Sequence, residues 1–496
     1  MDTSSSQKTT SSAQRPSLSA LLDCFSGCAD LTERKISYGL ADELELPVLW
    51  LDGMVAASAV SLELLRPLTE LLRAVGVGEP ADALRRIEAG GAYRCSVQRR
   101  DGLDEAASDL CRGCCLVLFE DLGCVLSFEL KTGERRSVST TTLERSLKGG
   151  KDAFTETLRV NTALVRYRLA TPRLKLVEGR VGRRSRTQVA IVYLEGVAAP
   201  DTVQELARRL DALDIDALLA TGPLEEALVD APLSPFPQLL HTERPDRFAM
   251  HLANGRVGLL VDGLPIGLVL PATLAEFLKV TGDSSMHFLV ASALSLLRWL
   301  ALGIGALLPG IFAAMALYHQ ELIPTKLLLS IIQAEQDVPF STSIELLGLL
   351  AAFSMLQEAG LRMPDPIGDT VSIIGALIVG QAAVEAKVVS PISIIVVATS
   401  GIACYTLPSQ DLAAAVRLVR LGLLLGAILA GLFGVGLVAW LVLLHLADLE
   451  SFGVAYTAPL SSGRPGALAR LLLRRPKLRD RWRDPLLRTP DKRRQA

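Results

Sequence analysis

Two long apolar segments separated by a short polar turn constrain this chain more than any other feature. They cover residues 367–386 and 389–407, and the turn lies around Lys387 and Pro391. Each segment is close to the roughly 20 residues that a helix needs to cross the hydrocarbon core of a bilayer. The sequence therefore predicts a helical hairpin in a membrane.

Polar side chains in and near these segments are the candidate functional residues. Gln381 and Glu385 lie one helical turn apart and so share a face. Glu345 and Glu358 lie in segment 343–361, which is apolar on one side. An ionisable group at membrane depth is costly and usually functional. We therefore expect these four residues to include some that face a water-filled path between subunits.

Structural roles for two of these residues stay open at this point. Glu385 can end its helix at the headgroup level beside Lys387. Glu358 can pair with Arg362, four residues later, on a surface helix. Glu345 has no basic residue at that spacing.

Two further apolar segments, 299–318 and 421–445, complete a set of four predicted spans. Four crossings keep both ends of the chain on one side of the membrane. They leave Arg417 and Arg420 on the opposite side, against the tendency of basic residues to stay inside. Two more crossings resolve this conflict only if residues 327–361 form a hairpin.

Both ends of the chain are predicted to be cytoplasmic. Residues 1–16 are rich in Ser and Thr, which indicates disorder, and they lack the basic and apolar regions of a signal peptide. Residues 464–494 are rich in Lys and Arg, which favours the cytoplasmic side. A basic run directly after a membrane helix indicates topology and contact with anionic lipid, and we prefer this to a nucleic-acid-binding arm.

The N-terminal half of the chain carries the patterns of a soluble α/β protein. Half of the 496 residues are hydrophobic and 21% are charged, which favours a soluble portion joined to a membrane portion. A strand is predicted at 47–55, a helix at 61–75 and a β-hairpin over 115–130. The same order recurs at 188–197, 202–213 and 256–270.

An internal repeat explains this recurrence. The motif LDG at 51–53 aligns with LEG at 194–196, and Glu120 or Asp121 aligns with Asp262. Both matches have nearly the same separation of about 142 residues. The sequence thus predicts two tandem, related α/β modules.

The predicted fold class is an α/β soluble N-terminal region of two tandem related modules, followed by an α-helical transmembrane domain. The predicted divisions are a disordered N-terminus (1–16), a first module (17–150), a second module (151–286), a transmembrane helical domain (287–448) and a basic cytoplasmic tail (449–496).

The sequence carries no catalytic or nucleotide-binding signature, so we expect neither an enzyme nor a cofactor. The run KGGK at 148–151 lacks the first Gly and the Ser or Thr of a P-loop, and HExxH and GxSxG are absent. His319 and Glu321 lack the second His that a zinc protease needs on the same helical face.

Eight cysteines raise one metal hypothesis. Cys24, Cys28, Cys111 and Cys114 have spacings that allow a four-thiolate zinc site. Cys114 and Cys115 run directly into an apolar strand, where free cysteine is usually a small buried hydrophobe. We therefore expect free thiols and no metal.

A dense, ordered series of short motifs runs from Asn161 to the end of the apolar part. In the soluble part these are NTALVRYRL at 161–169, GRRSRTQVAIVYLEG at 182–196, SPFPQ at 234–238, TERPD at 242–246 and GRVGLLVDGLP at 255–265. Further on they are LLPG at 307–310, HQELIPT at 319–325, PIGDTVSIIGALIVGQAAVEA at 366–386, VSPI at 389–392 and SFGVAY at 451–456. Over residues 17–460 the chain closely resembles the GerA family of spore germination proteins, specifically the A subunit of nutrient germinant receptors.

This resemblance implies a multi-pass subunit of a receptor in the inner spore membrane. Its implied partners are a transporter-like B subunit, a lipoprotein C subunit and further copies of itself in a ring. The implied role is to form a cation path that opens when a nutrient binds and so starts germination.

Two alternatives to this role stay open. The run KGGKD at 148–152 departs from the family pattern before Asn161, which leaves room for a sporulation-stage paralogue that acts as an accessory ion channel. A self-contained transporter is the second alternative, although its architecture usually shows symmetry in the membrane half, whereas this repeat lies in the soluble half. The missing signatures disfavour a membrane hydrolase.

Overall fold

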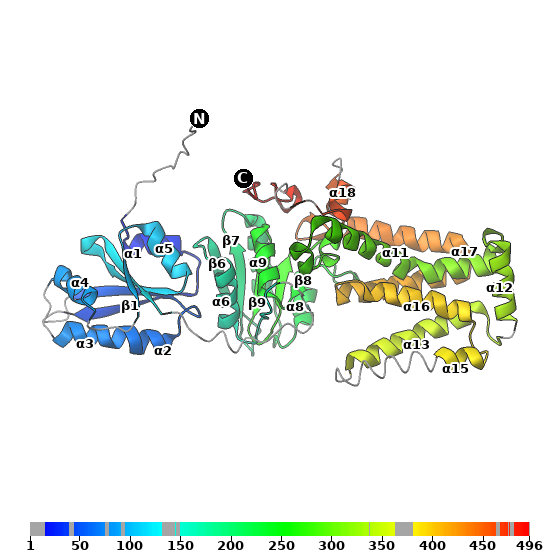
Figure 1. The fold of residues 1–496 in the computed structure, drawn as a ribbon, viewed down its shortest axis with the longest axis horizontal. Coiled ribbons are helices and arrows are strands. Elements are labelled where there is room, and N and C mark those ends of the chain that lie inside the picture. Colours follow the sequence, from blue (N-terminus) through cyan, green and yellow to red (C-terminus); the bar gives the residue numbers. More distant parts are fainter. Residues whose placement is uncertain are drawn as a thin grey trace, which may run out of the picture. The chain divides into compact units, whose positions relative to one another are not determined.

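The chain folds into two compact units (Figure 1). The computed structural model describes residues 15–38, 44–74, 79–90, 95–130, 144, 149–336, 338–362, 380–462, 467–474, 476 and 481–495. The first unit comprises Met1–Val229, Leu239–Pro271 and Asp480–Ala496, and the second comprises Asp230–Gln238 and Ala272–Arg479. Most of the predicted N-terminal disorder (1–16) and of the predicted span 367–386 lies outside the described residues.

The first unit contains two five-stranded antiparallel sheets. The first sheet has the order β1-β2-β4-β5-β3, with β1 (Leu31–Tyr38), β2 (Leu44–Leu51), β3 (Val97–Arg100), β4 (Cys114–Phe119) and β5 (Cys124–Glu129). Helices α1 (Leu18–Cys24) and α5 (Leu103–Cys111) cover one face, and α2 (Ala57–Ala59) and α3 (Arg66–Ala74) cover the other (Figure 1). Helix α4 (Pro80–Glu88) and a π-helical turn (Val60–Leu65) complete this module.

The second sheet has the same strand order, β6-β7-β9-β10-β8. Its strands are β6 (Leu174–Val181), β7 (Thr187–Leu194), β8 (Leu240–Thr242), β9 (Val257–Val261) and β10 (Gly267–Leu270). Its helices are α6 (Leu158–Arg168), α7 (Pro200–Asp211), α8 (Thr221–Leu228) and α9 (Pro245–Ala253). The predicted fold class is therefore confirmed, with two related α/β modules before a helical region, whereas the predicted module limits stay a prediction.

The pairing register repeats along with the strand order. Leu31 pairs with Leu51 at the first edge of one sheet, and Leu174 pairs with Leu194 at the same place in the other. The predicted hairpins over 115–130 and 256–270 are the adjacent pairs β4-β5 and β9-β10. Since a one-residue slip turns every side chain to the other face, this agreement means that the two modules use the same core positions.

The residues that the repeat aligned have the same structural roles. Gly53 and Gly196 end the LDG and LEG motifs with positive φ angles of 83° and 77°, which glycine adopts without strain. Glu120 accepts a hydrogen bond from the backbone N–H of Leu18 (2.6 Å), at the start of α1. Asp262 accepts one from the N–H of Leu158 (3.0 Å), at the start of α6. Of the two residues proposed for the first module, Glu120 is thus the counterpart of Asp262.

A fully buried ion pair joins the two modules. Arg166 on α6 donates two hydrogen bonds to Asp30, from Nε at 2.6 Å and from Nη2 at 2.8 Å. Both side chains are almost completely buried. Beside this pair, Cys28 and Leu176 form a parallel backbone bridge. A guanidinium held in this bidentate way fixes the relative orientation of the groups that carry it.

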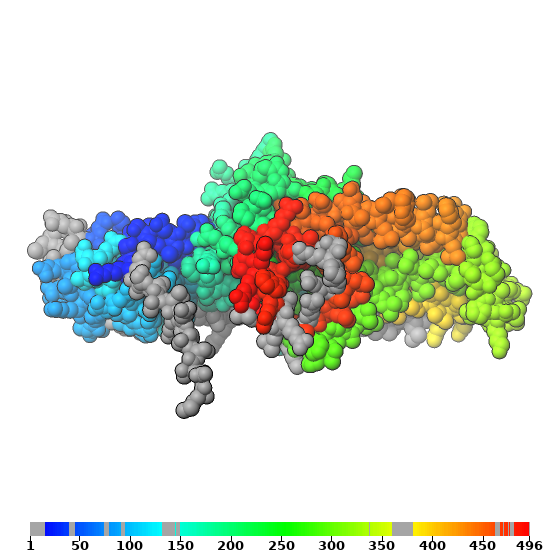
Figure 2. Space-filling model, turned by 90° about the horizontal axis from the view of Figure 1, so that it is seen from above, coloured from blue at the N-terminus to red at the C-terminus, as the bar shows by residue number. Residues whose placement is uncertain are grey.

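The end of the chain packs against the second module (Figure 2). Arg483 Nε donates to the carbonyl of Ala253 (3.1 Å), and its Nη1 pairs with Asp491 (2.7 Å). Thr489 is buried beside Gly255, where a Cβ would lie 2.3 Å from its methyl group. Part of the predicted basic tail is therefore folded into the first unit.

The second unit is a bundle of apolar helices. Its helices are α11 (Phe288–Tyr318), α12 (Thr325–Glu335), α13 (Thr342–Arg362), α15 (Gly380–Glu385), α16 (Pro391–Tyr405) and α17 (Gln410–Asp448), preceded by α10 (Leu274–Phe277). A short β-ribbon, β11 (Glu450–Ser451) with β12 (Val454–Ala455), and α18 (Ala467–Leu472) follow. Helices α11 and α17 are long and apolar enough to cross a membrane, and α16 is a shorter apolar helix.

Helix α17 is a hairpin rather than one straight rod. Its backbone leaves helical geometry at Ala430 and Gly431. A Cβ on Gly434 would lie 1.9 Å from the carbonyl oxygen of Gly426, although eight residues of straight helix span about 12 Å. Tyr318, at the end of α11, donates a hydrogen bond to the carbonyl of Ile428 (2.7 Å) beside this turn. The prediction of one span over 421–445 is therefore wrong, because the chain reverses at Gly431.

The cysteines proposed for zinc lie in and around the core of the first module. Cys28 and Cys111 are buried, and Cys24 and Cys114 are half-buried. Burial raises the pKa of the Cys28 thiol, and it raises the pKa of Cys111 to about 12. Since metals and alkylating reagents need the thiolate, both thiols are poor ligands and poor nucleophiles at neutral pH.

We predict that removing one partner of the buried ion pair is strongly destabilising. Asp30→Asn should lower the free energy of unfolding by about 3–5 kcal/mol, because Arg166 is left charged and buried. The exposed pair Lys35–Glu45 is the matched control, and Glu45→Gln should cost less than about 1 kcal/mol. Denaturant unfolding of the full chain in detergent measures both changes. Equal losses of unfolding free energy in the two variants would contradict the claim that the buried pair of Asp30 and Arg166 stabilises the chain more than the exposed pair does.

We predict that the folded chain is unaffected by metal chelators and that Cys28 and Cys111 resist alkylation at pH 8. Their thiolate fractions are small because burial raises both pKa values. Mass spectrometry after alkylation, with and without denaturant, checks the thiols. A melting temperature that falls with chelator would restore the zinc hypothesis.

Candidate polar path in the helical unit

Glu345 lies inside the helical bundle, where it caps a neighbouring helix. It is on the first turn of α13 and only 3% exposed. Its Oε1 accepts a hydrogen bond from the backbone N–H of Ser390, the N-cap residue of α16. A carboxylate at this position satisfies an unpaired donor and faces the positive end of the helix dipole. The structure therefore gives Glu345 a definite structural partner that lies 45 residues away in the sequence.

The second oxygen of Glu345 is in a different situation. Oε2 is buried and has no hydrogen-bond partner among the residues that the structure describes. Ser390 and Ser393 are buried nearby, and their hydroxyl groups hydrogen-bond to each other (3.0 Å). An ionised oxygen without donors is costly inside a protein, so this site favours a water molecule or a cation.

The other three predicted residues lie on the surface of the described chain. Gln381 and Glu385 are exposed on α15, on one face as the spacing predicts. Glu358 is exposed near the opposite end of α13, about 20 Å along that helix from Glu345. The structure brings Glu345 next to the segment that follows Glu385, but it does not gather the four residues into one cluster.

A second buried polar group was noted in the sequence only as a topology conflict. Arg420, in the first half of α17, is 2% exposed, and its Nη1 donates to Ser400 Oγ (3.1 Å). Ser400 in turn donates to the carbonyl of Gly305 on α11 (2.8 Å). No carboxylate in the described part of the chain pairs with Arg420. Arg417, one turn earlier, donates to Gln357 on α13 (3.3 Å).

The basic residue that opens the first span is also bonded within the chain. Arg298 on α11 pairs with Asp283 through Nη1 at 2.6 Å and Nη2 at 2.9 Å. It also donates to the carbonyl of Leu278 (3.2 Å). Arg298 and Arg420 are thus buried against specific acceptors.

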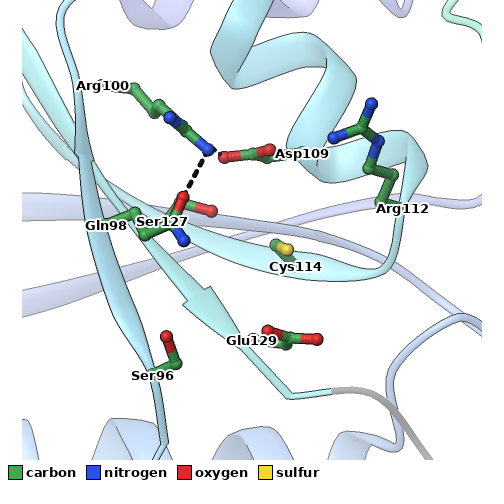
Figure 3. Close-up of a pocket in the computed structure, with 8 residues that line it drawn as sticks. All are labelled: Ser96, Gln98, Arg100, Asp109, Arg112, Cys114, Ser127 and Glu129. Atoms are coloured by element: carbon green, nitrogen blue, oxygen red, sulfur yellow. Dashed lines mark hydrogen bonds and ion pairs between the residues drawn. The ribbon is translucent and has the colours of Figure 1, made fainter.

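A small polar cavity of about 130 Å³ lies in the first module, away from the helical bundle (Figure 3). It lies between the sheet and the end of α5, and its lining includes both acidic and basic side chains. The lining residues are Ser96, Gln98, Arg100, Asp109, Arg112, Cys114, Ser127 and Glu129. The sequence had singled out only Cys114 here, as a metal candidate. Within the described residues, no group of three or more His, Cys, Asp or Glu side chains is arranged to hold a metal ion.

Comparison with known proteins identifies relatives over almost the whole chain. The family model described as Bacillus/Clostridium GerA spore germination protein matches residues 19–485. The uncharacterized membrane protein YfkQ of Bacillus subtilis (strain 168) is 34% identical, over 91% of this chain and 86% of that protein. Spore germination protein KA of the same organism is 32% identical, over 94% of this chain and 85% of that protein.

One similar solved structure is the N-terminal domain of the A subunit of the Bacillus megaterium spore germinant receptor GerK3. It is 29% identical, with a TM-score of 0.41, over 52% of this chain and 94% of that one. The family match spans both modules and the helical bundle. The chain therefore belongs to the GerA family of Bacillus and Clostridium spore germination proteins.

Proposed function

We propose that this chain is a membrane subunit of a spore nutrient-germinant receptor, and that several copies surround a cation path whose opening starts germination. The observation that carries the proposal is the family match over residues 19–485, together with relatives named as spore germination proteins. Partners are a transporter-like B subunit and a lipoprotein C subunit. The chain itself is not an enzyme in this proposal.

The helical unit is the part that lies in the inner spore membrane. Two of its helices are long and apolar enough to cross a bilayer, and one relative is named as a membrane protein. Large apolar side chains such as Phe433 and Trp440 on α17 are exposed, as is Leu300 on α11. Contact of such side chains with lipid costs no free energy, whereas their exposure to water is unfavourable.

Both ends of the chain lie in the cytoplasm in this proposal. Residues 481–495 pack onto the second module, so the C-terminal end and the N-terminal modules belong to one folded unit. A chain with this property crosses the membrane an even number of times. Because the chain reverses at Gly431, the start of the hairpin, with Arg417 and Arg420, lies on the same side of the membrane as its end and therefore on the cytoplasmic side.

The cation path lies between copies of the chain. Glu358, Gln381 and Glu385 are exposed on helices of an otherwise apolar unit. A carboxylate facing lipid at mid-bilayer costs on the order of 2.5–3.5 kcal/mol on insertion scales, so association that moves these groups into a shared aqueous path is favoured. Rings of carboxylates also favour cations over anions.

Glu345 contributes to this path from inside the chain. Its Oε1 caps the start of α16, and its Oε2 is buried and has no hydrogen-bond partner among the described residues. In the proposal this oxygen binds water or a cation of the path. The accessory-channel and transporter alternatives differ in flux: a transporter couples cation flux to the gradient of a second solute, whereas a channel conducts the cation down its own electrochemical gradient.

We predict that Glu345→Gln and Glu385→Gln reduce nutrient-triggered potassium release while the complex assembles at normal levels. Glutamine keeps the acceptor for Ser390 but removes the charge. Glu226→Gln, at an exposed position of α8, is the matched control and should leave release unchanged. Potassium efflux from spores of each variant, with subunit levels from blots, is the measurement. Unchanged release in both path variants, or loss only through failed assembly, would place the path elsewhere.

We predict that a membrane-impermeant thiol reagent does not label Ser5→Cys or Ser462→Cys in intact cells. Both positions are cytoplasmic in the proposal. Glu321→Cys, just after the outer end of α11, is the positive control and should be labelled. If the reagent labels Ser5→Cys or Ser462→Cys more than it labels the chain without the substitution, the proposed topology is wrong.

A further inference from the structure

Two sequence motifs that lie far apart in the chain, SPFPQ at 234–238 and SFGVAY at 451–456, meet in the second unit. The first motif is part of the stretch Asp230–Gln238, which belongs to the second unit although the chain on either side of it belongs to the first. This stretch connects α8 to β8 of the second module. The second motif follows α17 and contains most of the β11-β12 ribbon.

Hydrogen bonds anchor the two motifs to each other. Ser451 is 1% exposed, and its Oγ donates to the carbonyl of Gln238 (2.9 Å) and accepts from the N–H of Ala272 (3.1 Å). The N–H of Phe452 donates to Asp230 Oδ2 (2.7 Å). Because these groups bond to one another, this part of the contact is a fixed anchor.

A side-chain hydrogen bond connects the first motif to the end of α17. Ser234 Oγ lies 2.7 Å from His445 Nε2. His445 is exposed near the end of α17, and its ring centroid lies 6.0 Å from that of Phe236. Water can replace either partner of an exposed hydrogen bond at small net cost, so this bond can open while the anchor stays closed.

A buried hydroxyl group in the same cluster is unsatisfied. Tyr456 is fully buried, and its ring centroid lies 6.4 Å from that of Phe236 and 6.2 Å from that of Phe277. Its Oη has no hydrogen-bond partner among the described residues. An unbonded buried hydroxyl raises the free energy of the arrangement that contains it, so an arrangement that supplies a partner gains by comparison.

We propose that these residues form a latch with two arrangements, which couples segment 230–238 to the end of α17. In the closed arrangement, seen here, Ser234 bonds to His445 and the hydroxyl of Tyr456 is unsatisfied. In the open arrangement this bond is broken, Phe236 moves with its segment, and water reaches Tyr456. The latch deepens the proposed function and rests on it, because α17 belongs to the helical unit that surrounds the cation path.

The latch gives opposite expectations for two conservative variants. Ser234→Ala removes the bond that favours the closed arrangement, whereas Tyr456→Phe removes the unsatisfied hydroxyl that disfavours it. The nutrient concentration for half-maximal potassium release should therefore move in opposite directions, by about twofold to tenfold each, which is the range for one hydrogen bond.

Potassium efflux is measured from spores that carry this receptor alone, over a dilution series of nutrient broth. Ser330→Ala is the control for Ser234→Ala, because Ser330 is exposed on α12 and bonds to a carbonyl of its own helix. Tyr193→Phe, at a half-buried position of β7, is the control for Tyr456→Phe. Both controls should respond as the parent does. Shifts in the same direction, or a shift below about twofold in either latch variant, would overturn the latch.

Variants of His445 test whether the bond itself acts. His445→Leu should match Ser234→Ala, and the double variant should not exceed either single one, because all three remove the same bond. His445→Gln keeps a hydrogen-bonding group and should respond more like the parent. Additive effects of Ser234→Ala and His445→Leu would show that the two residues act separately and would contradict the latch.

Thermal unfolding of the full chain in detergent tests the latch without ion flux. Tyr456→Phe should raise the melting temperature, and Ser234→Ala should lower it. A melting temperature of Tyr456→Phe at or below that of the parent would contradict the latch. Parent spores that release no potassium in nutrient broth would contradict the proposed function instead, and the melting temperatures would then decide the latch by themselves.

Discussion

Charged groups that leave water must be bonded or hydrated, and this constraint decides where the polar residues of the chain lie. Between the modules it produces the bidentate pair of Arg166 with Asp30. At the start of the helical bundle it produces the pair of Arg298 with Asp283. Glu345 meets the constraint with only one of its two oxygens. An incompletely satisfied carboxylate in a tightly packed bundle is where water or a cation is expected to bind.

The repeat shows how one fold is adapted to two surroundings. Strand order and register are the same in both modules, so their apolar cores obey the same pattern. The differences are concentrated at polar positions. Arg256 is buried in the second module, where it donates to the carbonyl of Pro271, whereas the first module has a polar cavity whose lining includes Asp109 and Glu129. The second module also holds the end of the chain, because Arg483 donates a hydrogen bond to the carbonyl of Ala253.

Sequence patterns predicted the central hairpins, the repeat and the fold class, because buried strands and helices carry continuous or periodic apolar residues. They missed edge strands such as β3, whose residues VQRR are polar and partly exposed. Hydropathy also cannot detect the reversal at Gly431, since apolar residues continue on both sides of it. The four candidate path residues were identified as polar residues in apolar segments. The partner of Glu345 was not predictable, because it is a backbone N–H supplied by a distant turn.

The central claim is that several copies of this chain surround an aqueous path lined by acidic residues of their helical units. Imaging of the detergent-extracted complex as single particles tests it most directly. The account predicts a closed ring of subunits in which Glu385 and Gln381 face the central axis. A particle with one copy of this chain, or a ring in which those residues face the detergent, would contradict it.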